Sequence, residues 1–210
     1  MRRLFLLLWL VLPLGGAAYH FGPGQDRLAE DRVARASELG LARAAEARST
    51  ADTSGDDAAR PLWEEAERAF DEALLHLPKG NELTLAKLRL ERAKAQLNIS
   101  KLPTARGELD GILRDLELAG ADDALLDDAR ETLANAQYYN TWLLRLEGEP
   151  RDVWEPEIEA ARQNFRLGAE RAETRGEAER AAEWNRSLES ALRLARMDLT
   201  ELQGLPLPSV

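Results

Sequence analysis

The chain has 210 residues, a formal charge of −10 and no cysteine. This length can bury a core within one body, the lack of cysteine excludes disulfides and thiolate chemistry, and so acidic a protein repels the phosphate backbone of nucleic acids. The two histidines, His20 and His76, lie on separate segments, so a histidine-rich metal site or a serine–histidine triad is hard to assemble.

Residues 1–24 have the pattern of an export signal. Two arginines precede an apolar stretch over residues 4–21, which favours keeping the amino end in the cytoplasm and exporting the rest of the chain. Small residues at 16–18 and Pro13 are typical of a cleaved signal peptide, whereas the 18-residue stretch also reaches the short limit for a membrane span. Two alternatives stay open: a signal peptide, or a membrane anchor with a Gly-Pro-Gly linker, in which residues 1–21 contact the membrane if uncleaved. Both place the body on the exported side, periplasmic or membrane-anchored in the cell envelope.

The body, residues 25–203, is predicted to be all-α, because apolar residues recur at spacings of three and four and no segment alternates with a period of two. About seven antiparallel helices are expected, over residues 26–48, 61–78, 82–99, 103–119, 123–147, 153–175 and 177–203. The polar run at 49–59 is predicted to be a loop, and residues 204–210 an extended tail. In the first helix, Leu28 and Leu39 are among the residues expected to face inward.

Three residues are predicted to cap the starts of helices. Asn81 and Asp122 each stand immediately before a helical pattern, and their side chains are suited to accept hydrogen bonds from the first backbone N–H groups. Asp152 is followed three residues later by Glu155, the spacing of a capping box. The connections between these helices are short, which predicts that neighbouring helices run antiparallel.

A packing register recurs on three of the predicted helices. Its copies are Ala66, Phe70, Ala73; Ala105, Leu109, Ile112; and Ala161, Phe165, Gly168. A small residue lets a partner helix approach while a large one fills the space beside it. With the closing Pro78, and with Pro103 before the second copy, this register resembles the second helix of the tetratricopeptide-repeat family. The resemblance implies an α-solenoid of stacked helix pairs. The alternative is an irregular helical bundle, because the copies stand 39 and 56 residues apart instead of about 34.

Aromatic and amide residues gather in the second half of the chain and form a possible partner-binding surface. Its members are Asn135, Tyr138, Tyr139, Trp142 and Trp154. Tyr138 and Trp142 are four residues apart and share a helix face, so a peptide or glycan could lie against them. The structural alternative is that these rings pack onto the following helix.

Carboxylates concentrate over residues 147–159, a group that could serve acid–base chemistry or hold Ca²⁺. They also occupy the first turns of a helix, where negative charge is favourable, with arginines nearby. No phosphate-binding loop, HExxH motif or nucleophile elbow is present. We therefore predict a non-enzymatic, envelope-associated scaffold that binds another protein, with no cofactor, no metal and no nucleic-acid partner. The alternative is a carbohydrate- or small-ligand-binding module that uses the Tyr138–Trp154 region.

Overall fold

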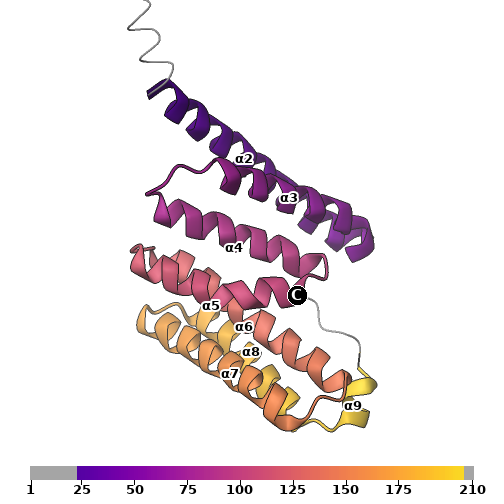
Figure 1. The fold of residues 1–210 in the computed structure, drawn as a ribbon. Helices are drawn as coiled ribbons and strands as arrows, with labels where there is room; N and C mark the ends of the chain where they lie inside the picture. Colours follow the sequence, from indigo (N-terminus) through magenta and orange to yellow (C-terminus); the bar gives the residue numbers. More distant parts are fainter. Residues whose placement is uncertain (1–22, 206–210) are drawn as a thin grey trace, which may run out of the picture.

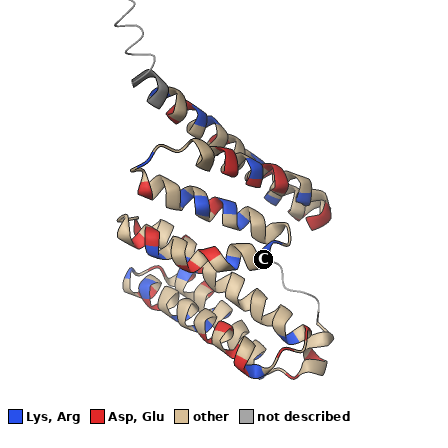
Figure 2. Ribbon diagram, in the orientation of Figure 1, with Lys and Arg blue, Asp and Glu red and all other residues tan. Residues whose placement is uncertain are grey.

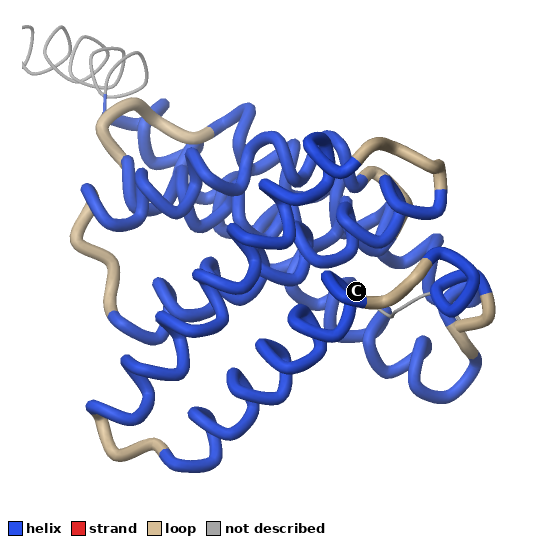
Figure 3. Tube along the Cα trace, turned by 90° about the horizontal axis from the view of Figure 1, so that it is seen from below, coloured by secondary structure: helices blue, strands red, loops and turns tan. Residues whose placement is uncertain are grey.

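The computed structural model describes residues 23–205, and this range is helical throughout apart from short turns (Figures 1 and 3). Its helices are α2 (Pro23–Ser54), α3 (Asp56–His76), α4 (Glu82–Asn98), α5 (Leu102–Leu118), α6 (Asp123–Leu146), α7 (Arg151–Thr174), α8 (Ala178–Arg196) and α9 (Leu199–Gln203). Residues 1–22 of the predicted export signal and 206–210 of the predicted tail lie outside this range, so both stay predictions. Among the helices described, none combines the length and apolar character that crossing a membrane requires.

The helices form a stack in which each one packs mainly against its neighbours along the chain (Figure 1). Contacts also join α2 to α4 and α4 to α6, so these alternate helices lie side by side. Such nearest-neighbour packing is the mark of a helical-repeat protein. The prediction of an all-α, solenoid-like fold is confirmed.

The packing register falls on α3, α5 and α7, which is every second helix, and all nine of its positions are buried. Its small members make room for rings. A Cβ atom added at Gly168 of α7 would lie 2.4 Å from the Trp184 ring of α8. The same relation holds between α2 and α3, where a Cβ atom at Gly40 would lie 2.6 Å from the Phe70 ring. Close approach of small residues to rings therefore sets the spacing of two helix pairs.

The buried residues form three clusters that continue into one another along the stack. One cluster joins α2, α3 and α4, the next joins α4, α5 and α6, and the third joins α6 to α9. Helices α4 and α6 each contribute to two clusters, with Leu88 and Leu90 of α4 belonging to different ones. Each internal helix pair therefore buries apolar surface on both sides, as a repeat stack requires.

Basic and acidic residues alternate along the helices, and α4 carries a row of basic residues (Figure 2). Arg92 of α4 pairs with Asp71 of α3 at 3.2 Å and with Glu108 of α5 at 2.6 Å. Lys94 pairs with Asp128 of α6 at 2.5 Å. Partly exposed ion pairs of this kind contribute little stability each, on the order of 0–1 kcal/mol. Their pattern links α4 to three neighbouring helices and favours one arrangement of the stack.

Two predicted boundaries are wrong. The loop expected at 49–59 is a single residue, Gly55, whose φ of 88° turns the chain between α2 and α3. Fully buried alanines at 47 and 59 hold the two helices together here, and tertiary packing outweighs the weak helix propensity of the Ser, Thr and Asp residues between them. The last predicted helix divides where Met197 is extended, and Asp198 caps α9 by accepting from the Glu201 N–H at 2.8 Å. This division gives eight helices within residues 23–205 instead of about seven.

The predicted caps and inward residues have mixed outcomes. Asp122 is confirmed as the cap of α6, because its carboxylate accepts from the Leu125 N–H at 2.9 Å. Asn81 instead donates its side-chain amide to the Pro78 carbonyl, and Pro150, not Asp152, precedes α7. The prediction that Leu28 and Leu39 face inward is also wrong: they are 42% and 51% exposed, because α2 is the first helix of the described stack and has few neighbours beyond α3.

Candidate functional site

The five predicted partner-binding residues lie on different sides of the stack. Tyr138 and Trp142 are neighbours, with ring centroids 6.2 Å apart, and both pack against the core cluster that α6 shares with α7 and α8. Trp142 is 5% exposed. Tyr139 is half-buried against the other cluster, which α6 shares with α4 and α5. Packing accounts for these three rings, and their role in binding stays a prediction.

Trp154 belongs to a contact that ties three helices together. The guanidinium carbon of Arg145 on α6 lies 4.8 Å from the centroid of the Trp154 ring on α7. The same guanidinium donates hydrogen bonds to the carbonyls of Leu194 and Met197, where α8 ends. Burial lowers the pKa of Arg145, and the charge of Asp198 acts in the opposite direction. This arrangement explains the half-buried Trp154 by packing.

The carboxylates of residues 147–159 are directed to separate partners. Glu157 accepts two hydrogen bonds from Arg106 of α5, at 2.8 and 3.0 Å. Glu155 pairs with Arg151 and Glu159 with Arg162, both within α7. Over residues 23–205, no group of three or more His, Asp or Glu side chains is arranged to hold a metal ion.

Asn135, the remaining predicted residue, lies in a pocket of about 230 Å³ that is lined by three alternate helices and by α3. We call this pocket the even-helix groove, and its polar and aromatic lining consists of Arg48, Trp63, Lys94, Asn98, Thr132 and Asn135. The residues come from α2, α3, α4 and α6, so segments up to 87 residues apart meet there. Stacking of alternate helices brings them together, because α2, α4 and α6 lie side by side.

Several polar groups in the even-helix groove have capacity for a ligand. In the part of the chain described, the Asn135 amide makes no hydrogen bond, and Asn98 uses only its amide nitrogen, which donates to the Lys94 carbonyl at 2.8 Å. The Arg48 guanidinium lies 5.5 Å from the centroid of the Trp63 ring. An amide side chain donates and accepts hydrogen bonds, and a guanidinium donates five. The groove can therefore engage both N–H and C=O groups.

Lys94 is held in place at the edge of the same groove. Its Nζ atom pairs with Glu91 at 2.7 Å and with Asp128 of α6 at 2.5 Å. Burial acts to lower the pKa of Lys94, but Glu91 and Asp128 together raise it above its ordinary value, so the side chain stays charged. Glu91 and Asp128 neutralise the charge of Lys94. The positive charge that the groove can present to a ligand is therefore that of Arg48.

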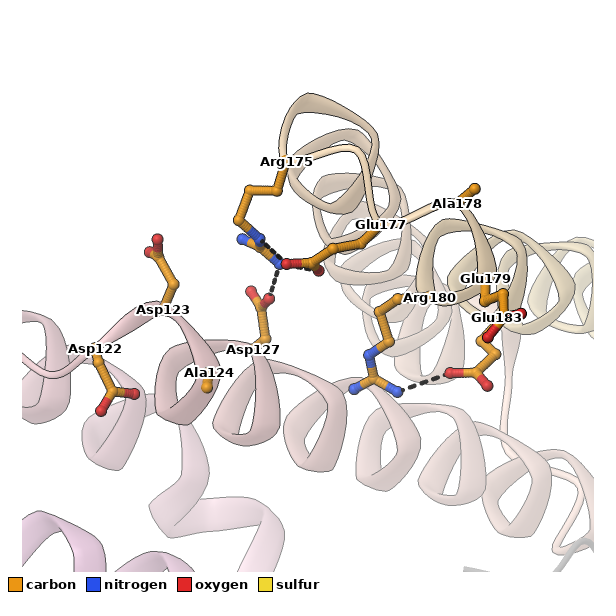
Figure 4. Close-up of a pocket in the computed structure, with 10 residues that line it drawn as sticks. All are labelled: Asp122, Asp123, Ala124, Asp127, Arg175, Glu177, Ala178, Glu179, Arg180 and Glu183. Carbon is orange, nitrogen blue, oxygen red and sulfur yellow. Dashed lines mark hydrogen bonds and ion pairs between the residues drawn. The ribbon is translucent and has the colours of Figure 1, made fainter.

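A second pocket, of about 990 Å³, lies between the start of α6 and the start of α8 (Figure 4). We call it the acidic pocket, and its charged lining consists of Asp122, Asp123, Asp127, Arg175, Glu177, Glu179, Arg180 and Glu183. Arg175, at the turn after α7, donates to Asp127 of α6 and to Glu177. The hydrogen bond from Arg175 lowers the pKa of Glu177 below its ordinary value of 4.5. The Glu177 carboxylate is therefore ionised near neutral pH.

Sequence reasoning identified Asn135 but missed the rest of both pockets. The alternation of the packing register was a partial signal, because it implies that every second helix lies side by side but does not say which of their residues share a surface. For the acidic pocket, the signal was a pair of acidic helix starts at 122–127 and 177–183.

Comparisons with protein-family models, with curated proteins and with solved structures find no match to this chain. Its function is therefore argued from the geometry and charge of these two pockets, together with the patterns in its sequence. Both pockets are lined by α6, which stands between them.

Proposed function

We propose that the protein is a non-enzymatic helical-repeat scaffold that binds an extended segment of a partner protein in the even-helix groove. The observation that carries this proposal is Asn135, a half-buried amide in the groove with no hydrogen-bond partner in the described chain. An extended peptide presents N–H and C=O groups to such an amide, and the apolar ring of Trp63 offers contact for a side chain.

Rigidity of the groove supports the same proposal. The polar groups on α4 and α6 lie on helices that are packed on both sides, and the contact of Lys94 with Asp128 ties α4 to α6. A preformed site loses less conformational freedom on binding than a flexible one, so more of the contact energy appears as affinity. Stacked helices suit the binding of an extended segment for this reason.

Two features of the sequence support the location and the class of the protein. The arginine-led apolar stretch before residue 22 is typical of an exported chain, so we place the scaffold in the cell envelope, on the exported side of the membrane. The register on α3, α5 and α7 resembles tetratricopeptide repeats, which implies a protein partner. No catalytic motif points to an enzyme. The carbohydrate-binding alternative is disfavoured, because Trp142 is buried and Tyr138 and Trp154 pack against the same cluster.

The test is selection of peptides from a displayed random library on the full chain, followed by affinity measurement on variants. We expect Asn135→Ala to weaken the selected peptides about tenfold, because it removes a side chain that pairs with peptide backbone. Asn140→Ala is the matched control: it changes the same residue type on the same helix, is also half-buried, and lies outside the groove.

The outcome separates a groove from a generally adhesive surface. Equal affinity of the selected peptides for wild type and for Asn135→Ala would contradict the proposal. So would a similar loss in both variants, because that result would place the peptide elsewhere on α6. Circular dichroism of each variant checks that the helical content is unchanged.

A further inference from the structure

We propose that the acidic pocket is a second binding site, which receives an arginine or lysine side chain from a basic protein segment. The pocket lies between α6 and α8 (Figure 4) and is open to the surface. It shares no lining residue with the even-helix groove. This second site goes beyond the proposed function, because binding in the acidic pocket does not depend on which residues bind a peptide in the even-helix groove.

The charge of the pocket favours a cation. Six carboxylates and two guanidinium groups line it, a formal balance of −4. The N-termini of α6 and α8 point toward it, and each contributes a partial charge of about +0.5, so the balance stays near −3. Both arginines are already paired: Arg175 with Asp127 and Glu177, and Arg180 with Glu131 at 2.6 Å and Glu183 at 3.1 Å.

Helix capping explains only part of this acidity. Acidic residues stabilise a helix from its cap and first turn, and Asp122, Asp123 and Glu179 stand in such positions. Asp127 is the fifth residue of α6 and Glu183 the sixth of α8, beyond the first turn, where the favourable interaction has faded. Asp127 pairs with Arg175 and Glu183 with Arg180, so ion pairs inside the pocket, and not helix capping, account for these two positions.

Asp127 supplies a second observation that points to a ligand. The residue is 6% exposed and lines the pocket, with its carboxylate directed from α6 toward the α7–α8 turn (Figure 4). One of its oxygens accepts from Arg175, whereas the other, Oδ1, is buried and has no hydrogen-bond partner among the described residues. A buried carboxylate oxygen without a donor is unfavourable, and a cationic donor entering beside Arg175 would satisfy it.

The shape of the pocket selects a side chain on a peptide over a bare ion. Its volume of about 990 Å³ is at the upper end of the roughly 300–1,000 Å³ typical of ligand pockets, so it holds a long side chain with part of its backbone. The described carboxylates do not converge as metal ligands would. Arg175 already illustrates how this pocket holds a guanidinium, between the carboxylates of Asp127 and Glu177.

The test measures binding of a fluorescent peptide of alternating glycine and arginine to the full chain, at low and at high salt. The paired probe replaces each arginine with citrulline, which keeps the shape and most hydrogen bonds but removes the charge. We expect the arginine peptide to bind at least tenfold more tightly, and its affinity to fall as salt screens the carboxylates.

Two substitutions in the pocket locate the binding. Glu179→Gln removes an exposed carboxylate with no ion-pair partner in residues 27–205 and should weaken the arginine peptide about threefold. Asp127→Asn should weaken it about tenfold, because it removes the buried charge. Glu64→Gln on α3 is the matched control, since it also removes one exposed carboxylate, and it should leave the affinity unchanged.

Three results would overturn the assignment. One is equal binding of the citrulline peptide, and another is the same loss in Glu64→Gln as in Glu179→Gln, which would mean attraction to the net charge alone. The third is displacement by spermidine at the concentration at which the peptide itself competes, which would assign the pocket to free polyamines. Asn135→Ala should not affect the arginine peptide, so failure of the even-helix groove and failure of the acidic pocket are distinguishable.

Discussion

Two glycines act through the rings that lie against them. Gly168 of α7 faces Trp184, which is 2% exposed, and Gly40 of α2 faces Phe70, which is fully buried. Neither ring has free space into which it could move, because each belongs to a packed core cluster. Glycine is needed at these two positions because it has no side chain, and not because its backbone is flexible.

We predict that Gly168→Ala destabilises the protein by about 1–3 kcal/mol, because the new methyl group overlaps the Trp184 ring. The gain in helix propensity, up to about 1 kcal/mol, does not offset this. The measurement is urea unfolding followed by circular dichroism.

Gly107→Ala is the control for that substitution. Gly107 is also helical, on α5, but a Cβ atom there meets no described atom within 4 Å. We expect this variant to be more stable by about 0.5–1 kcal/mol. Destabilisation of equal size in both variants would rule out the clash with Trp184 as the cause.

At the scale of elements, Arg145 determines how α8 ends. The last carbonyls of a helix lack partners within it, and here a guanidinium from α6 binds two of them. The chain then extends at Met197 and restarts as α9, which packs back against α6. One side chain thus joins the end of α8 to the body of the stack.

We predict that Arg145→Met lowers the free energy of unfolding by about 2–3 kcal/mol, since it removes charged hydrogen bonds to the α8 carbonyls while a long apolar stem remains. Arg186→Met is the control, because Arg186 is exposed on α8 and its side chain makes no hydrogen bond or ion pair in the described range. Unfolding in urea measures both. An equal effect in the two variants would mean that the loss of charge, not the contact with α8, matters.

At the scale of the whole molecule, stability comes from contacts between successive helices along the stack. Within residues 23–205, each helix contacts its neighbours, and α4 and α6 each contribute to two of the three core clusters. In such a stack, a local disturbance is expected to spread to adjacent pairs and to fade beyond them. The two ends should therefore respond independently.

We predict that Gly40→Ala accelerates amide hydrogen exchange in α2 and α3 and leaves α7 and α8 unchanged, because its clash with Phe70 lies at one end of the stack. Gly168→Ala should do the reverse. Hydrogen exchange followed by mass spectrometry of peptide fragments measures both variants. Uniform acceleration over all helices in either variant would show instead that the stack opens as one unit.

The sequence by itself determined the class of the fold and its repeat. Spacings of three and four residues predicted helices, and the register at Ala66, Ala105 and Ala161 identified α3, α5 and α7 as equivalent and marked Gly168 as a close approach. These features are local, because a helix buries the residues that recur on one of its faces. The export signal was also predicted from local pattern and stays a prediction.

Only the tertiary structure decided which faces meet. Gly40 opposite Phe70, Asn135 in one groove with Arg48, and Asp127 opposite Glu177 are pairs that lie 30, 87 and 50 residues apart. Periodicity gives the buried face of each helix but leaves open the rotation and crossing at which two helices pack. A small rotation of one helix changes which residues lie next to each polar residue at the edge of the helix contact. Both pockets could therefore be identified only in the folded chain.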